Sequence, residues 1–258
     1  MNIKIILCGC FGRMGTAICN MVTAMPDMEV VLGLDTFKSN VPRPYPIFSN
    51  INEYLTPADV IISYLPPSAA DDTVALLNFS VKNKMPLIIC TTGLSQEIEN
   101  TIVNAAKETA VFYSANMSLG VNVLTHILKN VSKLLYDSNF DIELIEKHHN
   151  KKLDAPSGTA FILVDAIKES VGLQMQAVTD RNSALTERSR NEIGVSTVRG
   201  GNIIGEHSVI FAGQNETIEI THAAQSRDVF AEGTLKAAKF MCDKPPGLYT
   251  MQDLIDAF

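Results

Sequence analysis

The segment 146–160 combines side chains that exchange protons with side chains that attract anions. It reads EKHHNKKLDAPSGTA, so His148 and His149 stand beside Lys151 and Lys152. Histidine is the side chain whose proton equilibrium lies closest to neutral pH, and the lysines add positive charge. We therefore expect a proton donor held beside an anionic small molecule. A polar loop without a catalytic role is the alternative, because single histidines are often ordinary polar residues.

A helix is predicted directly after these side chains. Apolar residues recur at helical spacing from Ala160 to Val171. Asp154 is predicted as the N-cap of this helix, with Pro156 in its first turn. The N–H groups at a helix start favour an anion, and Gly158 would let that anion approach the backbone closely.

A second chemical signature lies near the N-terminus. The run 9–15 reads GCFGRMG and follows the apolar stretch Ile3–Leu7. A helix is predicted over 16–25 and a strand over 29–34, which ends at Asp35, twenty residues after the last glycine. This order is typical of the dinucleotide-binding fingerprint, in which glycines admit the pyrophosphate and the acid binds the ribose. A cysteine at the second position departs from the usual glycine spacing, and a purely structural turn is the alternative.

The residues around Asp35 bear on cofactor choice. An acid here favours the free 2′-hydroxyl of NAD, whereas a 2′-phosphate usually needs an arginine nearby. Thr36 follows Asp35, and the nearest basic residues are Arg13 and Lys38. The sequence therefore favours NADH, with NADPH tolerated.

Strands and helices alternate through the first part of the chain. Strands are predicted over 59–65, 87–90 and 110–113, with helices over 68–83 and 95–107 between them. This alternation predicts an α/β fold with a Rossmann-type, doubly wound parallel sheet. Ligands of such sheets gather beyond the carboxyl ends of the strands. The residues at these ends, and hence the expected cofactor contacts besides Asp35, are Gly9, Cys10, Phe11, Gly12, Arg13, Met14, Cys90, Thr91, Thr92, Ser114, Ala115, Asn116 and Met117.

The pattern changes after residue 118. A long helix around 124–135 precedes a second α+β domain with a mixed or antiparallel sheet of about four strands. The segment 174–193 is predicted as a long mobile loop, whose arginines are interpreted as solvated surface. The predicted strands are 140–147, 194–199, 206–212 and 216–223, and the arginines are Arg181, Arg188 and Arg190.

The domain boundaries follow from these patterns. Residues 1–118 with 229–258 are predicted as the dinucleotide-binding domain, because the helical tail is expected to return to it. Residues 119–228 are predicted as the substrate-binding and oligomerisation domain. The helix from Gly158 can cover one face of the second sheet, and a homo-oligomer partner could cover the other.

Composition excludes several classes of function. The net charge of −7 opposes nucleic-acid binding. No apolar run approaches the roughly 20 residues that span a bilayer, and the chain begins directly with a predicted strand. The five cysteines form no C-x-x-C pair, and Cys8 and Cys90 end apolar runs, as expected of buried small residues. We expect a cytoplasmic protein with neither a membrane segment nor a metal site.

Several of these motifs together resemble one family. The chain is similar to the 4-hydroxy-tetrahydrodipicolinate reductases, also called dihydrodipicolinate reductases, of the diaminopimelate route to lysine. The resemblance covers essentially the whole chain, and its most specific part is the pattern H-H-x-x-K-x-D-A-P-S-G-T. The motifs that carry it are Gly9–Gly15, 146–160, Gly205–His207, Ile220–His222 and Ser226–Arg227.

The resemblance implies an activity and roles for particular residues. The family reduces the cyclic dicarboxylate 4-hydroxy-tetrahydrodipicolinate to tetrahydrodipicolinate with NADH or NADPH and loss of water. It implies that His148 is the proton donor or acceptor and Lys152 a second proton donor. The implied substrate-binding residues are His149, Ser157, Gly158 and Thr159.

The resemblance also bears on assembly and cofactor contacts. It implies a homotetramer whose second-domain sheets pack together, and it agrees with the cofactor contacts expected above. Two positions depart from the family. Thr36 stands where members that use NADPH well often have arginine, and Cys90 stands where glycine is common.

Two other functions stay open at this point. A nucleotide-sensing binding protein would need a DNA-binding or partner-binding module, which the acidic charge opposes. Another Rossmann reductase, such as an amine or amino-acid dehydrogenase, would share the two-domain plan, since a fold does not determine a substrate.

Overall fold

The computed structural model describes residues 2–37, 39–53, 57–181 and 185–257. The chain forms two compact units. Unit 1 is Met1–Leu119 with Asp228–Phe258, and unit 2 is Gly120–Arg227. The dinucleotide-binding and substrate-binding roles assigned to residues 1–118 with 229–258 and to residues 119–228 stay predictions.

Unit 1 is built on a parallel sheet of seven strands in the order β12-β6-β5-β4-β1-β2-β3. The central strands β1 and β4 are mostly apolar, and β4 and residues 5–8 of β1 are buried, as parallel sheets covered by helices require. The order from β6 to β3 is that of dinucleotide-binding folds, with the switch point between β1 and β4. The predicted Rossmann-type fold is thus confirmed. The strands are β1 (Ile3–Cys8), β2 (Met28–Leu34), β3 (Ile47–Phe48), β4 (Val60–Ser63), β5 (Leu87–Ile89), β6 (Ala110–Tyr113) and β12 (Gly247–Tyr249).

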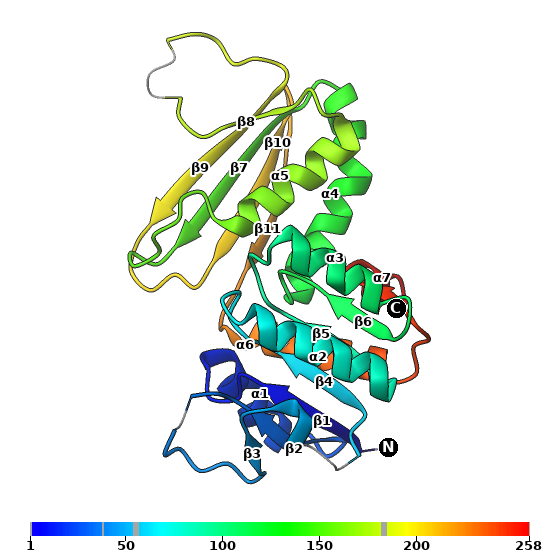
Figure 1. The fold of residues 1–258 in the computed structure, drawn as a ribbon. Coiled ribbons are helices and arrows are strands. Elements are labelled where there is room, and N and C mark those ends of the chain that lie inside the picture. Colours follow the sequence, from blue (N-terminus) through cyan, green and yellow to red (C-terminus); the bar gives the residue numbers. More distant parts are fainter. Residues whose placement is uncertain (1, 38, 54–56, 182–184, 258) are drawn as a thin grey trace. The chain divides into compact units, whose positions relative to one another are not determined.

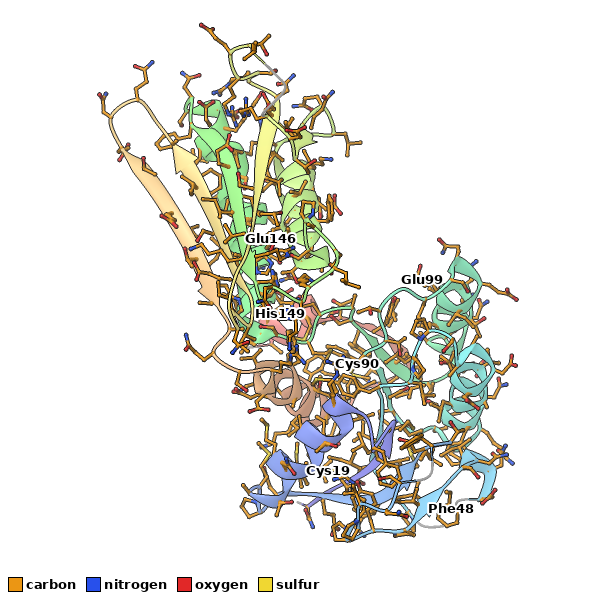
Figure 2. The ribbon with its side chains drawn as sticks, turned by 90° about the vertical axis from the view of Figure 1, so that its left-hand side faces the viewer. Cys19, Phe48, Cys90, Glu99, Glu146 and His149 are labelled. Carbon is orange, nitrogen blue, oxygen red and sulfur yellow. The ribbon has the colours of Figure 1, made fainter. Side chains whose placement is uncertain are left out.

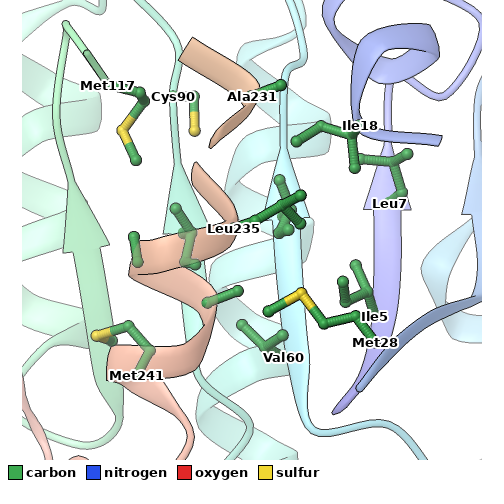
Figure 3. Packing of buried hydrophobic residues seen from close by; sticks show 14 of the residues in the cluster. Ile5, Leu7, Ile18, Met28, Val60, Cys90, Met117, Ala231, Leu235 and Met241 are labelled. Atoms are coloured by element: carbon green, nitrogen blue, oxygen red, sulfur yellow. The ribbon is translucent and has the colours of Figure 1, made fainter. Parts of the chain in front are cut away.

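Helices cover both faces of this sheet (Figure 1). On one face, α1 and α6 bury Ile18 and Leu235 against β1 and β4, and Figure 3 shows this packing with Ile5 and Val60. On the other face, α2 and α3 pack against the apolar residues of β4 and β5. Burying a side chain such as Leu235 stabilises the fold by roughly 1.5–3 kcal/mol. The helices are α1 (Arg13–Thr23), α2 (Ala70–Asn83), α3 (Gln96–Ala105), α6 (Asp228–Met241) and α7 (Met251–Asp256).

Several details of unit 1 differ from the predictions. The segment between Asp35 and residue 59, for which no helix or strand was predicted, contains the short strand β3 and a 3-10 turn at Ile51–Glu53. Cys90 follows β5 instead of ending it, although it is buried as predicted. The tail forms β12 before α7, because β12 pairs with the edge strand β6. Lys38, named above for cofactor choice, lies outside the described residues.

Unit 2 contains a mixed sheet of five strands in the order β11-β10-β7-β9-β8. The helices α4 (Leu119–Asp137) and α5 (Gly158–Val171) lie on the same face of it (Figure 1). Strand β7 alternates between half-buried and buried residues, and its buried side chains form a core with both helices. The strands are β7 (Asp141–His148), β8 (Gln176–Val178), β9 (Glu192–Arg199), β10 (Glu206–Ala212) and β11 (Thr217–Ala223).

The prediction that residues 174–193 form a long mobile loop is partly wrong. The segment contains β8, which pairs in parallel with β9, and β9 itself begins two residues earlier than predicted. The guanidinium of Arg188 donates to the carboxylates of Asp141 and Glu143 at 2.7 and 3.0 Å and to three backbone carbonyls. This arginine is therefore an anchor of the segment and not solvated surface. Residues 182–184 lie outside the described part of the chain.

Among the described residues, no helix combines the length and the apolar character that crossing a membrane would require.

Candidate functional site

The pairing of strands β7, β9 and β10 brings the polar side chains of the unit 2 site next to one another. Glu146 and His148 stand two residues apart on β7, so both side chains lie on the buried face of the sheet. Thr197 of β9 and His207 of β10 flank Glu146, and Arg199 of β9 lies opposite His148. Five polar side chains from three neighbouring strands therefore converge on a face that is apolar elsewhere.

Glu146 is the most deeply buried ionisable group of this cluster, with an exposed fraction of 0%. Both terminal nitrogens of the Arg199 guanidinium donate hydrogen bonds to its carboxylate, at 2.7 and 2.8 Å. The amide of Ser157 and the hydroxyl of Thr197 donate to Oε1 at 3.1 and 3.2 Å. Burial alone would raise the pKa of Glu146, but the bonds from Arg199 and His148 outweigh it and lower that pKa to about 2. Glu146 is therefore a carboxylate at neutral pH.

His148 is bound to this carboxylate through one ring nitrogen. Its Nδ1 lies 2.6 Å from Oε2 of Glu146. Burial lowers the pKa of His148, and the Glu146 carboxylate opposes that effect only in part, since the charges of Lys152 and Arg199 also lower it. Its Nε2 lies where a Cβ on Gly205 would come within 3.0 Å, so the glycine leaves room for the ring. Among the described residues, the ring is bonded through Nδ1 alone, which leaves Nε2 available to a ligand.

His207 packs edge-on against His148, with ring centroids 5.2 Å apart. Its Nε2 lies 2.9 Å from the hydroxyl of Ser157. Burial, followed by the facing His148 ring, lowers the pKa of His207 to about 4. His207 is therefore a neutral imidazole near neutral pH.

The start of α5 differs from the prediction. Ser157, not Asp154, is the N-cap, and its hydroxyl accepts from the amide of Ala160 at 3.1 Å. Asp154 instead forms an ion pair with Lys152, and Pro156 precedes the helix. Asp154 and Ser157 are both favourable capping residues, and the contacts of Ser157 with Glu146 and His207 place the helix start.

The backbone at this helix start is open. A Cβ added at Gly158 would meet no atom within 4 Å, so this glycine is not required by the packing of unit 2. Thr159 follows it and is half-buried. A 14-residue helix whose first turn is accessible at a glycine fits an anionic ligand.

The remaining predicted residues of unit 2 lie in the turn after β7. Lys152 places its ammonium 2.9 Å from Asp154, and its side chain is about one-fifth exposed. The backbone carbonyl of His149 accepts from the amide of Lys152, and Nδ1 of His149 is buried without a partner among the described residues. Figure 2 shows Glu146 and His149 along the same strand and turn. The structure therefore brings all six predicted catalytic and substrate-binding residues of unit 2 to one end of β7 and α5.

The glycine turn of unit 1 fits a dinucleotide. Gly9 has a positive φ of 77°, and Gly12 is the N-cap of α1 without any side-chain cap bond. A Cβ on Gly15 would lie 2.2 Å from the carbonyl oxygen of Gly9, so only glycine allows α1 to pack this closely on the turn. Arg13 and Met14 open α1. The start of α1 thus presents backbone N–H groups to a phosphate, as the fingerprint requires.

Asp35 lies at the end of β2, next to this turn. Its carboxylate accepts from the amides of Phe11 and Phe37, both at 2.9 Å. It also borders a cavity of about 130 Å³ together with Thr36 and Asn50. A carboxylate beside a cavity and a glycine turn suits a ribose hydroxyl.

The other predicted cofactor residues follow β5 and β6 at the same edge of the sheet. Cys90 and Met117 are buried, so they can meet a ligand only through their backbone. The hydroxyl of Thr91 bonds to the carbonyl of Leu65, and that of Ser114 to the carbonyl of Asn116. The buried side chain of Cys10 likewise turns inward, below Gly33. Thr92 and Ala115 lie in the same two turns.

Sequence reasoning missed several polar partners in these sites. Glu146 and His207 belong to the motifs noted above, but no role was predicted for them, and Arg199 was not singled out. The two-residue spacing of Glu146 and His148 on a strand could have signalled the first pair. Arg43, in the segment before β3, bonds to the carbonyl of Cys10 and the hydroxyl of Thr16 and was also missed.

Together, these features define a class of protein. In the described part of the chain, no group of histidine, cysteine and acidic side chains is arranged to hold a metal ion. The Rossmann-type sheet, its glycine turn and the acid at the end of β2 fit a nicotinamide dinucleotide, and a histidine with acid-base capacity lies in unit 2. The chain is an oxidoreductase of the class that uses NADH or NADPH.

Comparison with known proteins gives the family. Residues 3–117 match the model of the dihydrodipicolinate reductase N-terminus, and residues 120–255 match that of its C-terminus. A 4-hydroxy-tetrahydrodipicolinate reductase of Caldanaerobacter subterraneus is 47% identical over 99% of both chains, and one of Clostridium novyi is 48% identical over 98% of both. The chain belongs to the dihydrodipicolinate reductase family, as the sequence predicted.

A solved structure shows the same fold. The dipicolinate-bound dihydrodipicolinate reductase from Paenisporosarcina superposes with a TM-score of 0.82 at 23% identity, covering 97% of this chain and 98% of that one. The diaminopimelate dehydrogenase of Corynebacterium glutamicum reaches a TM-score of 0.56 at 13% identity, over 97% of this chain and 93% of that one.

Proposed function

We propose that the chain reduces 4-hydroxy-tetrahydrodipicolinate to tetrahydrodipicolinate in the diaminopimelate route to lysine, with NADH or NADPH and loss of water. The observation that carries this proposal is the pairing of His148 with Glu146 beside the open start of α5, in a chain of this family. Family membership limits the candidate substrates, and the geometry supports a proton donor at His148 next to an anion site at the start of α5.

The residues of unit 1 would bind the cofactor. The amides at the start of α1 would bind its pyrophosphate, with Gly9, Gly12 and Gly15 allowing the close approach. Asp35 would bind the ribose hydroxyls. The turns after β5 and β6 would line the nicotinamide side of the same sheet edge. When bound, the cofactor supplies the hydride.

The residues of unit 2 would bind and protonate the substrate. The first turn of α5, at Gly158 and Thr159, would hold one carboxylate, and His149 would assist. Lys152 would neutralise negative charge and act as a second proton donor. Charge develops on the substrate as it accepts a hydride. His148 in its imidazolium form would donate the Nε2 proton that removes this charge and would return to the neutral ring.

The test is to follow NADH absorbance with NADH and freshly generated 4-hydroxy-tetrahydrodipicolinate and, separately, with NADH and a panel of keto acids or with NAD+ and a panel of amino acids. We expect turnover with the cyclic dicarboxylate alone. His148→Gln should lower kcat by roughly 100-fold or more at unchanged NADH affinity, because a general acid is lost and the cofactor turn is untouched. Lys152→Ala should lower kcat and raise the substrate KM, whereas the exposed Lys151→Ala is the matched control.

Three results would contradict the proposal. Oxidation of an amino acid in place of the dicarboxylate would indicate an amino-acid dehydrogenase, and cofactor binding without any turnover would indicate a sensor. Full activity of His148→Gln would remove His148 from its role.

Cofactor preference is a separate proposal. The carboxylate of Asp35 would repel a 2′-phosphate, and Thr36 offers no positive charge to offset that. NADH is thus expected to bind at least as tightly as NADPH, and a titration of both measures it. NADPH binding more than tenfold tighter would contradict this expectation.

We further propose a cytoplasmic homotetramer. All five cysteines are free, which suits a reducing compartment. The outward residues of the unit 2 sheet include the aliphatic Ile145, Val198 and Ile210, while α4 and α5 lie on its other face. A second copy of this sheet would suit such a face, and sedimentation equilibrium would give the mass of the assembly.

A further inference from the structure

The carboxylate of Glu146 accepts more hydrogen bonds than a residue that only fills space on β7 would need. Five donors from β7, β9 and the start of α5 reach its two oxygens: both terminal nitrogens of Arg199, Nδ1 of His148, the amide of Ser157 and the hydroxyl of Thr197. An ionised carboxylate this deep in the protein is costly unless it is saturated with donors. An aliphatic residue would fill the same place on the apolar face at lower cost.

The bonding fixes which nitrogen of His148 carries a proton. An ionised carboxylate only accepts hydrogen bonds, so Nδ1 of His148, 2.6 Å away, must be the donor. The neutral ring is then the Nδ1–H tautomer, with its lone pair on Nε2. Among the described residues, none bonds to Nε2, which lies beside Gly205.

We propose that Glu146 is the positioning residue of the site: held by Arg199, it keeps Nδ1 of His148 protonated, so that Nε2 is the atom that exchanges protons with the substrate. The substrate part of this inference rests on the proposed function, whereas the tautomer does not. Glu146 has no catalytic contact of its own, because it is wholly buried and both its oxygens are occupied.

The charges around His148 determine what loss of Glu146 would do. Four groups face the ring: Glu146 on the same strand, Arg199 on β9, His207 on β10 and Lys152 in the turn after β7. Glu146 is the only anion among these four, since His207 is neutral and the other two are cations. Without it, the protonated ring would face uncompensated positive charge, so its protonated form would become less stable.

Histidine side-chain NMR of the ¹⁵N-labelled protein tests the inference without substrate. The signals of His148 are assigned by their loss in His148→Gln. We expect the wild-type ring to show protonated Nδ1 and unprotonated Nε2 above its titration. In Glu146→Gln, the Nδ1–H tautomer should lose its dominance, and the titration midpoint should fall by about one pH unit or more. Turnover should fall roughly tenfold or more at unchanged NADH affinity.

Glu206→Gln is the matched control. Glu206 is an ion-paired glutamate on β10, bound to Lys147 on the opposite face of the same sheet, and its change should leave the His148 signals in place. A purely structural Glu146 would lower thermal stability without moving the tautomer or the midpoint.

Each outcome bears on the inference. A wild-type Nε2–H tautomer, or an unmoved midpoint in Glu146→Gln, would overturn it. If Glu146→Gln does not fold, the wild-type tautomer alone decides. Arg199→Lys is then a second variant, because it loses the paired hydrogen bonds to Glu146 but keeps the positive charge. A protein that shows the expected tautomer but does not reduce 4-hydroxy-tetrahydrodipicolinate would refute the proposed function and leave this inference standing.

Discussion

At the scale of single residues, a substitution at Gly158 should change substrate binding without lowering the stability of the fold. Gly158 is the first residue of α5, and a Cβ there would meet nothing within 4 Å. Gly158→Ala should therefore leave the free energy of unfolding unchanged or raise it by up to about 1 kcal/mol, since alanine has the better helix propensity. The added methyl would obstruct a carboxylate at the helix start. We expect the substrate KM to rise roughly tenfold in steady-state kinetics, equivalent to about 1.4 kcal/mol.

Gly200→Ala provides the comparison for this variant. Gly200 lies in the turn after β9 and has equally open surroundings, but no helix begins there. Its change should leave KM as in the wild type. An unaltered KM in Gly158→Ala would mean that the substrate carboxylate binds elsewhere.

The residue scale is also where the sequence was most informative and most incomplete. His148, Lys152 and Gly158 could be predicted because their types carry chemistry and lie within one short segment. Arg199 could not, because it lies 51 residues from His148 along the chain and meets it only through the pairing of β7 with β9. A local sequence pattern does not show which residues of two strands will pair.

At the scale of elements, prediction succeeded where periodicity is long. Strands such as β1 and β10 are apolar or alternating runs bounded by turn residues, so their position follows from local sequence. Strand β8 has three residues and exists because it pairs with β9, which no local pattern reveals. The start of α5 was misplaced for a related reason, since its cap is selected by contacts with β7 and β10.

The anchoring of the segment before β9 leads to a second prediction. Arg188 connects this segment to Asp141 and Glu143 of β7, and its side chain is mostly buried. Arg188→Met should lower the free energy of unfolding by about 1–3 kcal/mol, because charged hydrogen bonds are lost and Glu143 is left with a distant partner. Amide hydrogen exchange of residues 185–191 should accelerate.

Arg190→Met is the reference for this experiment. Arg190 is exposed and contacts the ring and carbonyl of Tyr136 on α4, so its loss should have a smaller effect on exchange. Equal exchange in Arg188→Met and the wild type would show that the segment is held by its backbone pairing alone.

At the scale of the whole molecule, the buried site should make stability depend on pH. His207 is 3% exposed, and burial and the facing His148 lower its pKa from 6.5 to about 4. Between pH 6.5 and about 4, His207 binds a proton in the unfolded chain but not in the native chain, so acidification favours unfolding. The contribution is complete above pH 6.5 and is lost as the pH falls toward 4. At about 1.4 kcal/mol per pKa unit, it is on the order of 3 kcal/mol.

Urea unfolding at several pH values between 7 and 4.5 measures this effect. His207→Gln stays neutral throughout, so its unfolding free energy should fall less on acidification than that of the wild type. His148 and His222, whose pKa values are also lowered by burial, would supply the slope that remains. Equal slopes in His207→Gln and the wild type would show that the native protein accepts a proton at His207, and the neutral partner assigned to His148 would then be wrong.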